Sequence, residues 1–289
     1  MIIPTITALR QQVREAKQKG LIVGFVPTMG ALHAGHRQLM ETARRECGFL
    51  VVSIFVNPLQ FDRADDLARY PRTLDADRAL CASAGVDVIF APTANELYPE
   101  EQKTFVDVPD LTENLCGAFR PGHFRGVATV VLKLFGIVQP DRAYFGQKDA
   151  QQLAVIDRMV RDLNVPVEIV PVPTIREPDG LALSSRNKHL SPAERQTAPA
   201  LYRALSLAAE QIASGERSAP LVRENALRFL QHHPEIRVEY FELVDPLTLQ
   251  PLVEISGPVL IAAAAWLGST RLIDNIAGDF RSPNRTITV

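Results

Sequence analysis

Two histidines stand beside glycines in the stretch PTMGALHAGH, which covers residues 27–36. An apolar run, typical of a buried strand, ends just before it, and a helix-like pattern begins near Gly35. The amide groups at the start of a helix suit a phosphate, and glycines let the backbone approach a ligand closely. His33 and His36 fall on the first helical turn, where both rings can donate hydrogen bonds to phosphate oxygens. The stretch therefore predicts a site for a phosphate-bearing molecule.

Three other interpretations of this stretch stay open. The Gly30-x4-Gly35 spacing is that of a P-loop, but His36 and Arg37 stand where a P-loop carries Lys and then Ser or Thr. The histidines could bind zinc, although no HExxH motif and no nearby Cys or Asp completes a ligand set. The two rings could also do no more than cap the helix.

Neutral amides follow a second apolar run, VVSIFVNPLQF. Asn57 and Gln60 can donate and accept hydrogen bonds at once, which suits a substrate that carries hydroxyl groups. An ordinary Asn-Pro turn after a strand would leave the same pattern.

Charged groups follow a third short strand, in YFGQKDAQQL. Gly146 opens the turn, Lys148 offers a point charge to a phosphate, and Asp149 can accept from a ribose hydroxyl. Gln152 lies one turn into the next helix. A solvated Lys-Asp pair at a helix start is the alternative.

Two hydroxyls and a guanidinium stand together in LALSSRN, at Ser184, Ser185 and Arg186. Such a group fits phosphate oxygens, although a surface turn has a similar composition. The stretch RPGHFRGVATV adds Arg120, His123 and Arg125 before a helix, and His123 can equally be a capping or core histidine.

The first half of the chain must position these groups by alternating strands and helices. Nearly continuous apolar runs at 21–27, 49–58, 86–92, 142–146 and 166–175 predict strands, and helix-like segments separate them. We expect helices over 7–20, capped by Thr7 and closed by Gly20, and over 34–47, 75–85, 124–138 and 150–163. This alternation predicts a mostly parallel sheet covered by helices on both faces, and such a sheet binds ligands at the carboxyl ends of its strands.

The pattern changes after residue 176. A polar loop comes first, followed by two helices that start near Ser191, where Pro192 and Glu194 complete a capping box. Three strand-like segments then follow, at 236–245, 257–268 and 270–276. We therefore expect two domains, residues 1–176 and residues 177–289, of which the second is a smaller α+β domain.

Composition excludes several classes of protein. Apolar residues make up 46% of the 289 residues and charged residues 22%, as in ordinary globular proteins. A net charge of −2 argues against a general nucleic-acid binder. The three cysteines are far apart and form no disulfide framework. The N-terminus lacks the pattern of a secretory signal and the apolar runs are too short to cross a bilayer, so the sequence predicts a cytoplasmic protein without membrane or nucleic-acid partners.

The motifs PTMGALHAGH, SIFVNPLQF, RPGHFRGV, FGQKDAQQL and LSSRN, in this order and at these separations, resemble the pantoate–β-alanine ligase (pantothenate synthetase) family over essentially the whole chain. The resemblance implies a Rossmann-like, doubly wound nucleotidyltransferase domain over residues 1–176, related to class I aminoacyl-tRNA synthetases, which binds nucleotide and pantoate. It implies that residues 177–289 form a lid domain that closes over the site. It also implies a two-step reaction. Pantoate attacks the α-phosphorus of ATP to give pantoyl adenylate and pyrophosphate, and β-alanine then displaces AMP to give pantothenate.

The resemblance also implies site residues. His36, His33, Lys148 and Arg186 would act in catalysis, with His36 either a hydrogen-bond donor or a proton donor. Gln60, Gln152 and Asn57 would bind substrate. Mg²⁺ would lie mainly on the phosphates, with Asp77 as a candidate carboxylate nearby, and the protein would be a homodimer. The residues expected to line the ATP site are Met29, Gly30, Ala31, Leu32, His33, Ala34, Gly35, His36, Gly146, Gln147, Lys148, Asp149, Ile175, Leu183, Ser184, Ser185 and Arg186.

Two other functions stay open. The chain could be a nucleotidyltransferase that stops after adenylyl transfer to another small acid. It could also be a non-catalytic nucleotide- or RNA-binding relative of the synthetase fold. The near-neutral charge weighs against RNA, and the presence of both histidines, Lys148 and Arg186 weighs against an inactive site.

Overall fold

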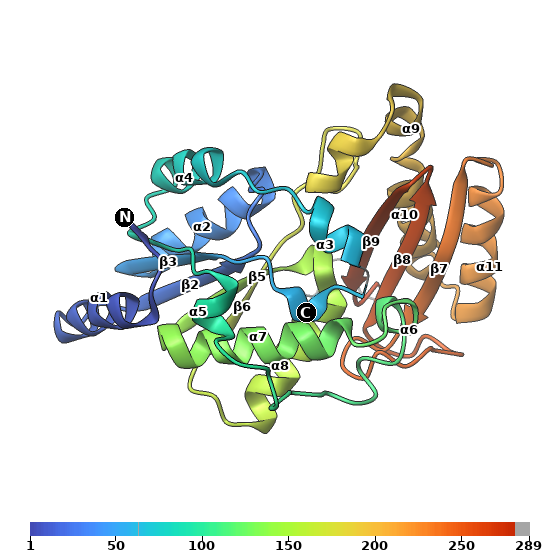
Figure 1. Cartoon of the computed structure of the whole chain (residues 1–289). Coiled ribbons are helices and arrows are strands. Elements are labelled where there is room, and N and C mark those ends of the chain that lie inside the picture. Colours follow the sequence, from blue (N-terminus) through green and yellow to red (C-terminus); the bar gives the residue numbers. More distant parts are fainter. Residues whose placement is uncertain (63, 281–289) are drawn as a thin grey trace. The chain divides into compact units, whose positions relative to one another are not determined.

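The computed structural model describes residues 1–62 and 64–280, which form two compact units (Figure 1). The first unit contains Met1–Pro109, Arg120–Gly146 and Val155–Val172. The second contains Asp110–Phe119, Gln147–Ala154 and the chain from Pro173 onward. The two units are therefore interleaved in the sequence.

A six-stranded parallel sheet forms the centre of the first unit, in the order β1-β4-β3-β2-β5-β6. The strands are β1 (Ile2–Ile3), β2 (Val23–Thr28), β3 (Phe49–Ile54), β4 (Val88–Phe90), β5 (Arg142–Gly146) and β6 (Glu168–Val172). The chain moves outward from β2 through β3 to β4, and then returns to the other side of β2 with β5. The strand order thus reverses beside β2, and a crevice at the carboxyl end of such a strand is the usual ligand site of this architecture.

Helices cover both faces of this sheet. Phe25 of β2 meets Phe135 of α7 (His123–Val138) edge to face, with ring centroids 6.3 Å apart. On the opposite face, Met40 of α2 (Ala34–Glu46) and Cys81 of α4 (Leu74–Ser83) pack in one buried cluster with Val52. The doubly wound parallel sheet predicted from the sequence is confirmed.

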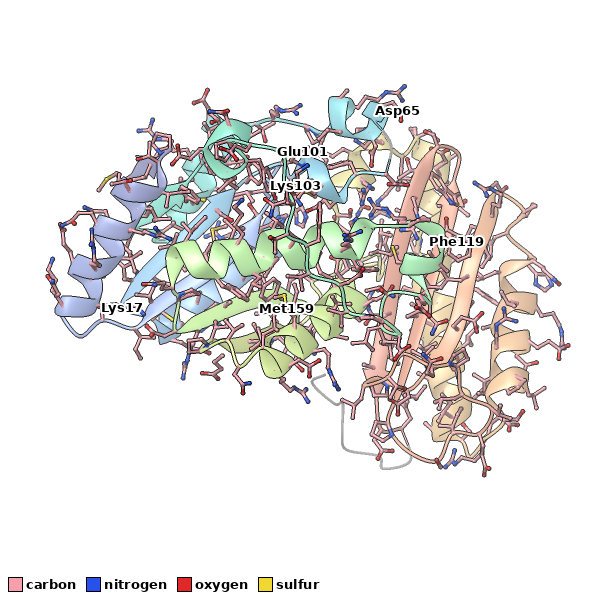
Figure 2. The ribbon with its side chains drawn as sticks, turned by 60° about the horizontal axis from the view of Figure 1, so that its bottom comes forward. Lys17, Asp65, Glu101, Lys103, Phe119 and Met159 are labelled. Atoms are coloured by element: carbon pink, nitrogen blue, oxygen red, sulfur yellow. The ribbon has the colours of Figure 1, made fainter. Side chains whose placement is uncertain are left out.

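The remaining segments of the first unit complete its layers. The helices are α1 (Ile6–Gln18), α3 (Ala64–Arg69) and α5 (Ala94–Leu97), with a 3-10 turn η1 (Pro58–Gln60) after β3. α8 (Ala150–Asp162) begins in the second unit and continues in the first. The chain after α5, where Figure 2 labels Glu101 and Lys103, runs along α7: Lys133 donates to Gln102 at 3.2 Å, and the Thr129 hydroxyl accepts from the amide of Val106.

The second unit contains a three-stranded antiparallel sheet, β7 (Ile236–Val244), β8 (Val259–Leu267) and β9 (Thr270–Gly278), in that order. Its helices are α6 (Cys116–Phe119), α9 (Pro192–Thr197), α10 (Ala200–Ala213) and α11 (Ala219–Leu230), with 3-10 turns η2 (Gln147–Asp149) and η3 (Ser185–His189). Alanines on the inner side of β8, Ala263 and Ala265, lie in one core with Ala204 and Ala208 of α10. Small side chains on both surfaces let the helices pack closely, and the predicted smaller α+β part is confirmed.

Several local expectations need correction. Helix α1 begins at Ile6, and its cap is Thr5, whose hydroxyl accepts from the amide of Ala8, rather than Thr7. β3 ends at Ile54, because the chain turns at Asn57 and Pro58. Three helices follow Ser191 where two were expected. The capping box at Ser191 and Glu194 is present as predicted, and the three cysteines are free and buried.

The expected division into domains of residues 1–176 and 177–289 stays a prediction. The interleaving itself has a clear cause. The Gln151 amide donates to the carbonyls of Leu111 and Asn114, at 2.8 and 2.7 Å, and the Asn114 amide donates to the carbonyl of Leu249. These side chains hold segments 110–119 and 147–154 to the chain around Leu249, although all three are distant in sequence.

Candidate active site

The two histidines lie at the carboxyl end of β2, where the strand order reverses. His33 is the cap of α2, and its Nδ1 accepts from the amide of Gly35 at 3.1 Å. His36 Nδ1 accepts from the amide of His33 at 3.3 Å, and the two ring centroids are 4.2 Å apart. The side chains therefore form a reciprocal cap on the helix, which was one of the open interpretations.

This cap determines the tautomer of each ring when the histidine is neutral. A backbone amide can only donate, so Nδ1 of His33 and of His36 must present a lone pair. A neutral imidazole carries one proton, which must then be on Nε2. Capping and phosphate binding therefore use different nitrogens of the same ring. The helix is capped through Nδ1, and Nε2–H is the group with which a neutral ring can donate to a phosphate oxygen.

The loop before α2 is held by the buried carboxylate of Asp77, from α4. Its two oxygens accept from the amides of Ala31 and Leu32, at 3.0 and 2.8 Å, and Oδ1 also accepts from the hydroxyl of Thr73. Ala31 has a φ of +51°, a conformation that non-glycine residues rarely adopt. Asp77 thus stabilises a strained turn, and its oxygens are engaged by the loop.

Side chains already accept from five backbone amides in this stretch. The amide of Gly30 donates to the Thr28 hydroxyl at 3.1 Å, while those of Ala31 and Leu32 donate to Asp77. The amides of His33 and Gly35 donate to the rings. These five amides, which suited a phosphate in the sequence, are therefore paired with side chains in the structure.

The predicted amides Asn57 and Gln60 lie together after β3. Asn57 is buried; its Nδ2 donates to Gln60 Oε1 and to the Gly126 carbonyl, both at 3.1 Å. Its Oδ1 accepts from the Tyr98 hydroxyl and from the amide of Leu59. These four contacts use its full hydrogen-bonding capacity. Asn57 thus orients Gln60 rather than offering a group to a ligand.

Gln60 connects the predicted residues that follow β3 with the loop that precedes α2. Its Nε2 lies 3.0 Å from Sδ of Met29, in the loop before α2. Glycine at 126 is required here, because a Cβ at that position would lie 2.2 Å from the carbonyl oxygen of Leu59. The close approach of α7 thus sets the position of η1, which brings Gln60 into contact with Met29.

His123 has a different environment from the paired histidines. It is buried, and its Nδ1 lies 2.8 Å from the carbonyl of Gln60. A carbonyl can only accept, so Nδ1 must carry the proton here. Arg120 lies 3.2 Å from the other ring nitrogen and 3.5 Å from Asp62. His123 therefore supports the backbone of Gln60, in agreement with its interpretation as a core histidine.

Burial also affects the phenol beside Asn57. Desolvation raises the pKa of Tyr98 to about 12. The hydroxyl therefore keeps its proton at neutral pH and donates to Asn57 Oδ1 at 2.9 Å. Tyr98 was not predicted from the sequence, because forty-one positions separate it from its partner.

The predicted groups of the second unit, Lys148, Ser184 and Arg186, line one small cavity together with Asp274. Ser184 Oγ accepts from the amide of Arg186 at 3.2 Å and caps η3. The preceding turn is closed by the amide of Leu183, which donates to the carbonyl of Ile175 at 2.9 Å. The structure thus brings the Lys148 segment and the Ser184–Arg186 loop together.

Arg176 organises the loop that contains these residues. It forms a two-pronged ion pair with the buried carboxylate of Asp274, at 2.6 and 2.9 Å, and donates to the carbonyl of Gly180. Its guanidinium also lies 3.8 Å from the ring centroid of Tyr202. Burial raises the pKa of Asp274, and the contacts with Arg176 act against that shift.

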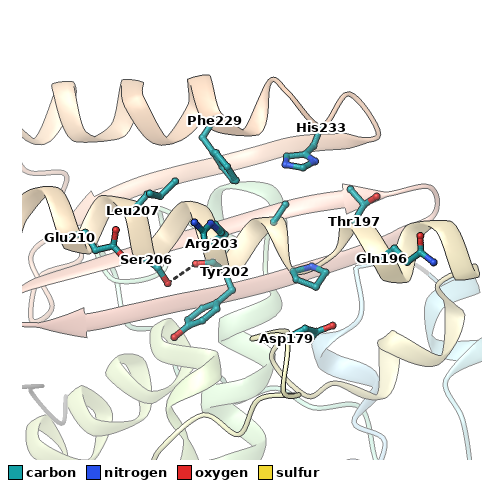
Figure 3. A pocket seen from close by; sticks show the side chains of 12 residues that line it. Asp179, Gln196, Thr197, Tyr202, Arg203, Ser206, Leu207, Glu210, Phe229 and His233 are labelled. Carbon is teal, nitrogen blue, oxygen red and sulfur yellow. Dashed lines mark hydrogen bonds between the residues drawn. The ribbon is translucent and has the colours of Figure 1, made fainter.

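A further cavity of about 320 Å³ opens beside α9, α10 and α11 (Figure 3). Tyr202, Arg203 and Ser206 line it from α10, and Phe229 and His233 line it from the α11 side. None of the predicted site residues is among its lining residues. Tyr202 borders this cavity and also the one that Lys148 and Arg186 line.

Two properties of residues 1–62 and 64–280 bear on partners. In this part of the chain, no three His, Cys, Asp or Glu side chains gather as a metal site. No helix in the same residues is both long and apolar enough to span a bilayer.

Comparison with known proteins gives consistent matches. The family model for pantoate-beta-alanine ligase matches residues 1–277. Pantothenate synthetase from Moorella thermoacetica is 56% identical over 275 residues, which are 95% of this chain and 97% of that protein.

Solved structures agree. The crystal structure of pantothenate synthetase from Thermus thermophilus matches with a TM-score of 0.90 and 52% identity, over 95% of this chain and 98% of that one. The pantoate-beta-alanine ligase from Francisella tularensis, complexed with beta-gamma ATP and beta-alanine, matches with a TM-score of 0.77 and 34% identity, over 96% and 97% of the two chains. The fold, the paired histidines and these matches agree, and the chain belongs to the pantoate–β-alanine ligase family.

Proposed function

We propose that this protein is an ATP-dependent ligase that condenses pantoate with β-alanine in two steps. In the first, a carboxylate oxygen of pantoate attacks the α-phosphorus of ATP, the bond to the bridging oxygen breaks, and pyrophosphate leaves with that electron pair. In the second, the β-alanine nitrogen attacks the acyl carbon, the bond to AMP breaks, and the nitrogen loses a proton as the amide forms. Family membership over nearly the whole chain supports this reaction.

The paired histidines carry the proposal. In the neutral form fixed by the helix cap, His33 and His36 donate from Nε2 to phosphate oxygens of ATP. These donors stabilise the negative charge that moves onto the departing pyrophosphate, and their positions are set before the substrate binds. His36 therefore acts as a hydrogen-bond donor. A second proton would have to occupy Nδ1 and would break the cap.

Neutral amide side chains position the acid. Gln60, buried beside Met29, binds pantoate through its amide and lies near the β-alanine site. Asn57 orients that amide. The backbone from Met29 to His36 borders the nucleotide, and Gln152 supplies a further contact to pantoate. Little covalent chemistry is required of the protein, so most of its effect comes from positioning.

Charged, hydroxyl and backbone groups of later segments supply the remaining nucleotide contacts. Lys148 and Arg186 bind phosphates, and Ser184 and Ser185 donate to the same oxygens. Gly146, Gln147 and Asp149 border the ribose and phosphates, Ile175 lies beside the adenine, and Leu183 completes the clamp. The cavity that Lys148, Ser184 and Arg186 share is consistent with a common anionic ligand.

Mg²⁺ is proposed to bind with ATP. It prefers oxygen ligands and keeps several waters, so phosphate oxygens would hold most of it, and its charge would help to neutralise the triphosphate. Asp77 fits poorly as a main ligand, because its oxygens already accept from two amides and a hydroxyl. We further propose that the protein is a cytoplasmic homodimer.

Exchange of labelled pyrophosphate into ATP tests the first step. The reaction would contain pantoate and Mg²⁺ but no β-alanine. Exchange that depends on pantoate is the expected result, because a reversible adenylate must form before the amine arrives. Addition of β-alanine should then release AMP and an amide in equal amounts.

Two outcomes would contradict the proposal. Exchange with other small acids but not with pantoate would indicate a nucleotidyltransferase of different specificity. ATP binding with no exchange and no pantothenate formation would indicate a nucleotide-binding protein instead. As a control, the His36→Asn variant should bind ATP but support little exchange.

A further inference from the structure

The side chain of Asn275, on β9, contacts the segment Gln147–Asp149, which is predicted to bind phosphate through Lys148. Its Nδ2 donates to the carbonyl of Gln147 at 3.0 Å and to that of Lys148 at 2.8 Å. Asn275 is buried, with 8% of its surface exposed. An amide nitrogen has two hydrogens, so both donors are used to fix two consecutive carbonyls of η2.

Asn275 is itself fixed from both sides. Its backbone amide donates to Asp274 Oδ1 at 2.8 Å, and its carbonyl accepts from Arg176 at 3.2 Å. Arg176 in turn holds Asp274 and the carbonyl of Gly180, in the loop that leads to Arg186. Asp274 and Asn275 thus connect the two segments that carry Lys148 and Arg186.

We infer that Asn275 is a positioning residue for adenylate formation, which places the Lys148 backbone so that its ammonium group reaches the phosphates of ATP. The inference rests on the proposed role of Lys148. No other common side chain of this size donates two hydrogen bonds while remaining neutral. Aspartate would turn a negative charge toward two carbonyl oxygens, and leucine would offer them no donor.

The test compares Asn275→Asp and Asn275→Ala with the unmodified protein in the pyrophosphate exchange assay. We expect the KM for ATP to rise roughly ten- to a hundredfold, because a small displacement of a positioned charge is costly. The KM for pantoate should be unchanged. Asn225→Asp is the matched control: Asn225 lies on α11, where its amide donates to Gln211, and this change should leave both constants unaltered.

A double-mutant cycle with Lys148→Ala separates a positioning role from a general structural one. If Asn275 acts through Lys148, Asn275→Ala should change the KM for ATP little once Lys148 is already alanine. Independent, additive effects in the double variant, or an unchanged KM for ATP in the Asn275 single variants, would overturn the inference.

The cycle also distinguishes this inference from the proposed function. An unchanged KM for ATP in Lys148→Ala would remove Lys148 from the ATP site, and the inference about Asn275 would fail with it, even if exchange itself remained. Should Asn275→Asp not fold, Asn275→Ala removes the same donors without adding charge. Calorimetric binding of a non-hydrolysable ATP analogue to that variant gives the same comparison without turnover.

Discussion

The two units hold their predicted phosphate-binding segments with opposite chemistry. In the first, the carboxylate of Asp77 accepts from two consecutive amides of the loop before α2. In the second, the amide of Asn275 donates to two consecutive carbonyls of η2. Each arrangement depends on one buried polar side chain from a distant part of the sequence. Both segments are therefore ordered before any ligand binds, which reduces the conformational cost of binding.

The difference determines which groups are left for the ligand. Asp77 engages backbone donors, so the first unit offers the side chains of His33 and His36 instead. Asn275 engages backbone acceptors, which removes two carbonyl oxygens from contact with an anion and leaves Lys148 as the cationic group of its segment. A loop that binds phosphate can thus be prepared either by occupying its donors or by covering its acceptors.

The largest expected effect on turnover is at His36, where two substitutions distinguish the capping role of Nδ1 from the donor role of Nε2–H. Asparagine can accept where Nδ1 does but has nothing in place of Nε2–H, whereas the longer glutamine can place a donor near the Nε2 position. His36→Asn should therefore lower kcat by about 10²–10³-fold while unfolding at nearly the same denaturant concentration. His36→Gln should retain more turnover and lose more stability. Steady-state kinetics and urea unfolding of both variants provide the measurement; equal kcat losses would contradict separate roles for the nitrogens.

A smaller effect is expected at Asp77. Asp77→Asn replaces one of the two accepting oxygens by a donor, so an amide of Ala31 or Leu32 loses its partner. The unfolding free energy should fall by about 1–3 kcal/mol, and kcat/KM for ATP should fall roughly tenfold. Asp75→Asn, an exposed change on the same helix, is the control. If Asp77→Asn kept full activity and stability, the carboxylate would not be what holds the loop.

Gly35→Ala should produce a still smaller change, with opposite effects on activity and stability. A Cβ at position 35 would lie 2.9 Å from Cε1 and 3.0 Å from Nδ1 of His33, so the ring must shift by a few tenths of an ångström. Turnover should fall only about three- to tenfold. The unfolding free energy should rise or stay level, because alanine favours a helix over glycine by about 0.5–1 kcal/mol. Unchanged turnover would show that the position of the His33 ring is not critical.

The smallest effect on catalysis is expected at Ser191, whose hydroxyl caps α9 by accepting from the amide of Glu194. Ser191→Ala should lower the unfolding free energy by about 1 kcal/mol through loss of the cap and leave kcat and both KM values unchanged. Thermal unfolding together with the exchange assay tests this. A large loss of turnover would mean that activity follows general stability, and the interpretation of the other variants would then need revision.

Local signals predicted much of the fold and part of the site. Apolar runs placed β2 and β5 within two residues at each end, and the positions of His33 and His36 put both rings on the first turn of α2. Thr5 and Thr7 offer the same chemistry two residues apart, so sequence alone could not choose between them as the cap of α1.

The supporting residues could not be predicted, because their contacts are distant in sequence. Asp77 lies forty-six positions from Ala31, and Asn275 lies 127 positions from Lys148. Asn275 sits in a strand pattern that carries no catalytic signature. The contact of Gln60 with Met29 depends on the approach of α7 at Gly126, which packing alone determines.

The central claim is that His33 and His36 cap α2 through Nδ1 and present Nε2–H to the substrate. Nitrogen-15 NMR of the imidazole rings measures this directly, with the six histidines assigned by single substitutions. We predict that both neutral rings carry the proton on Nε2 in the free protein, and that His123, whose Nδ1 faces a carbonyl, shows the opposite tautomer. A proton on Nδ1 of His33 or His36 in the folded, neutral state would contradict the account.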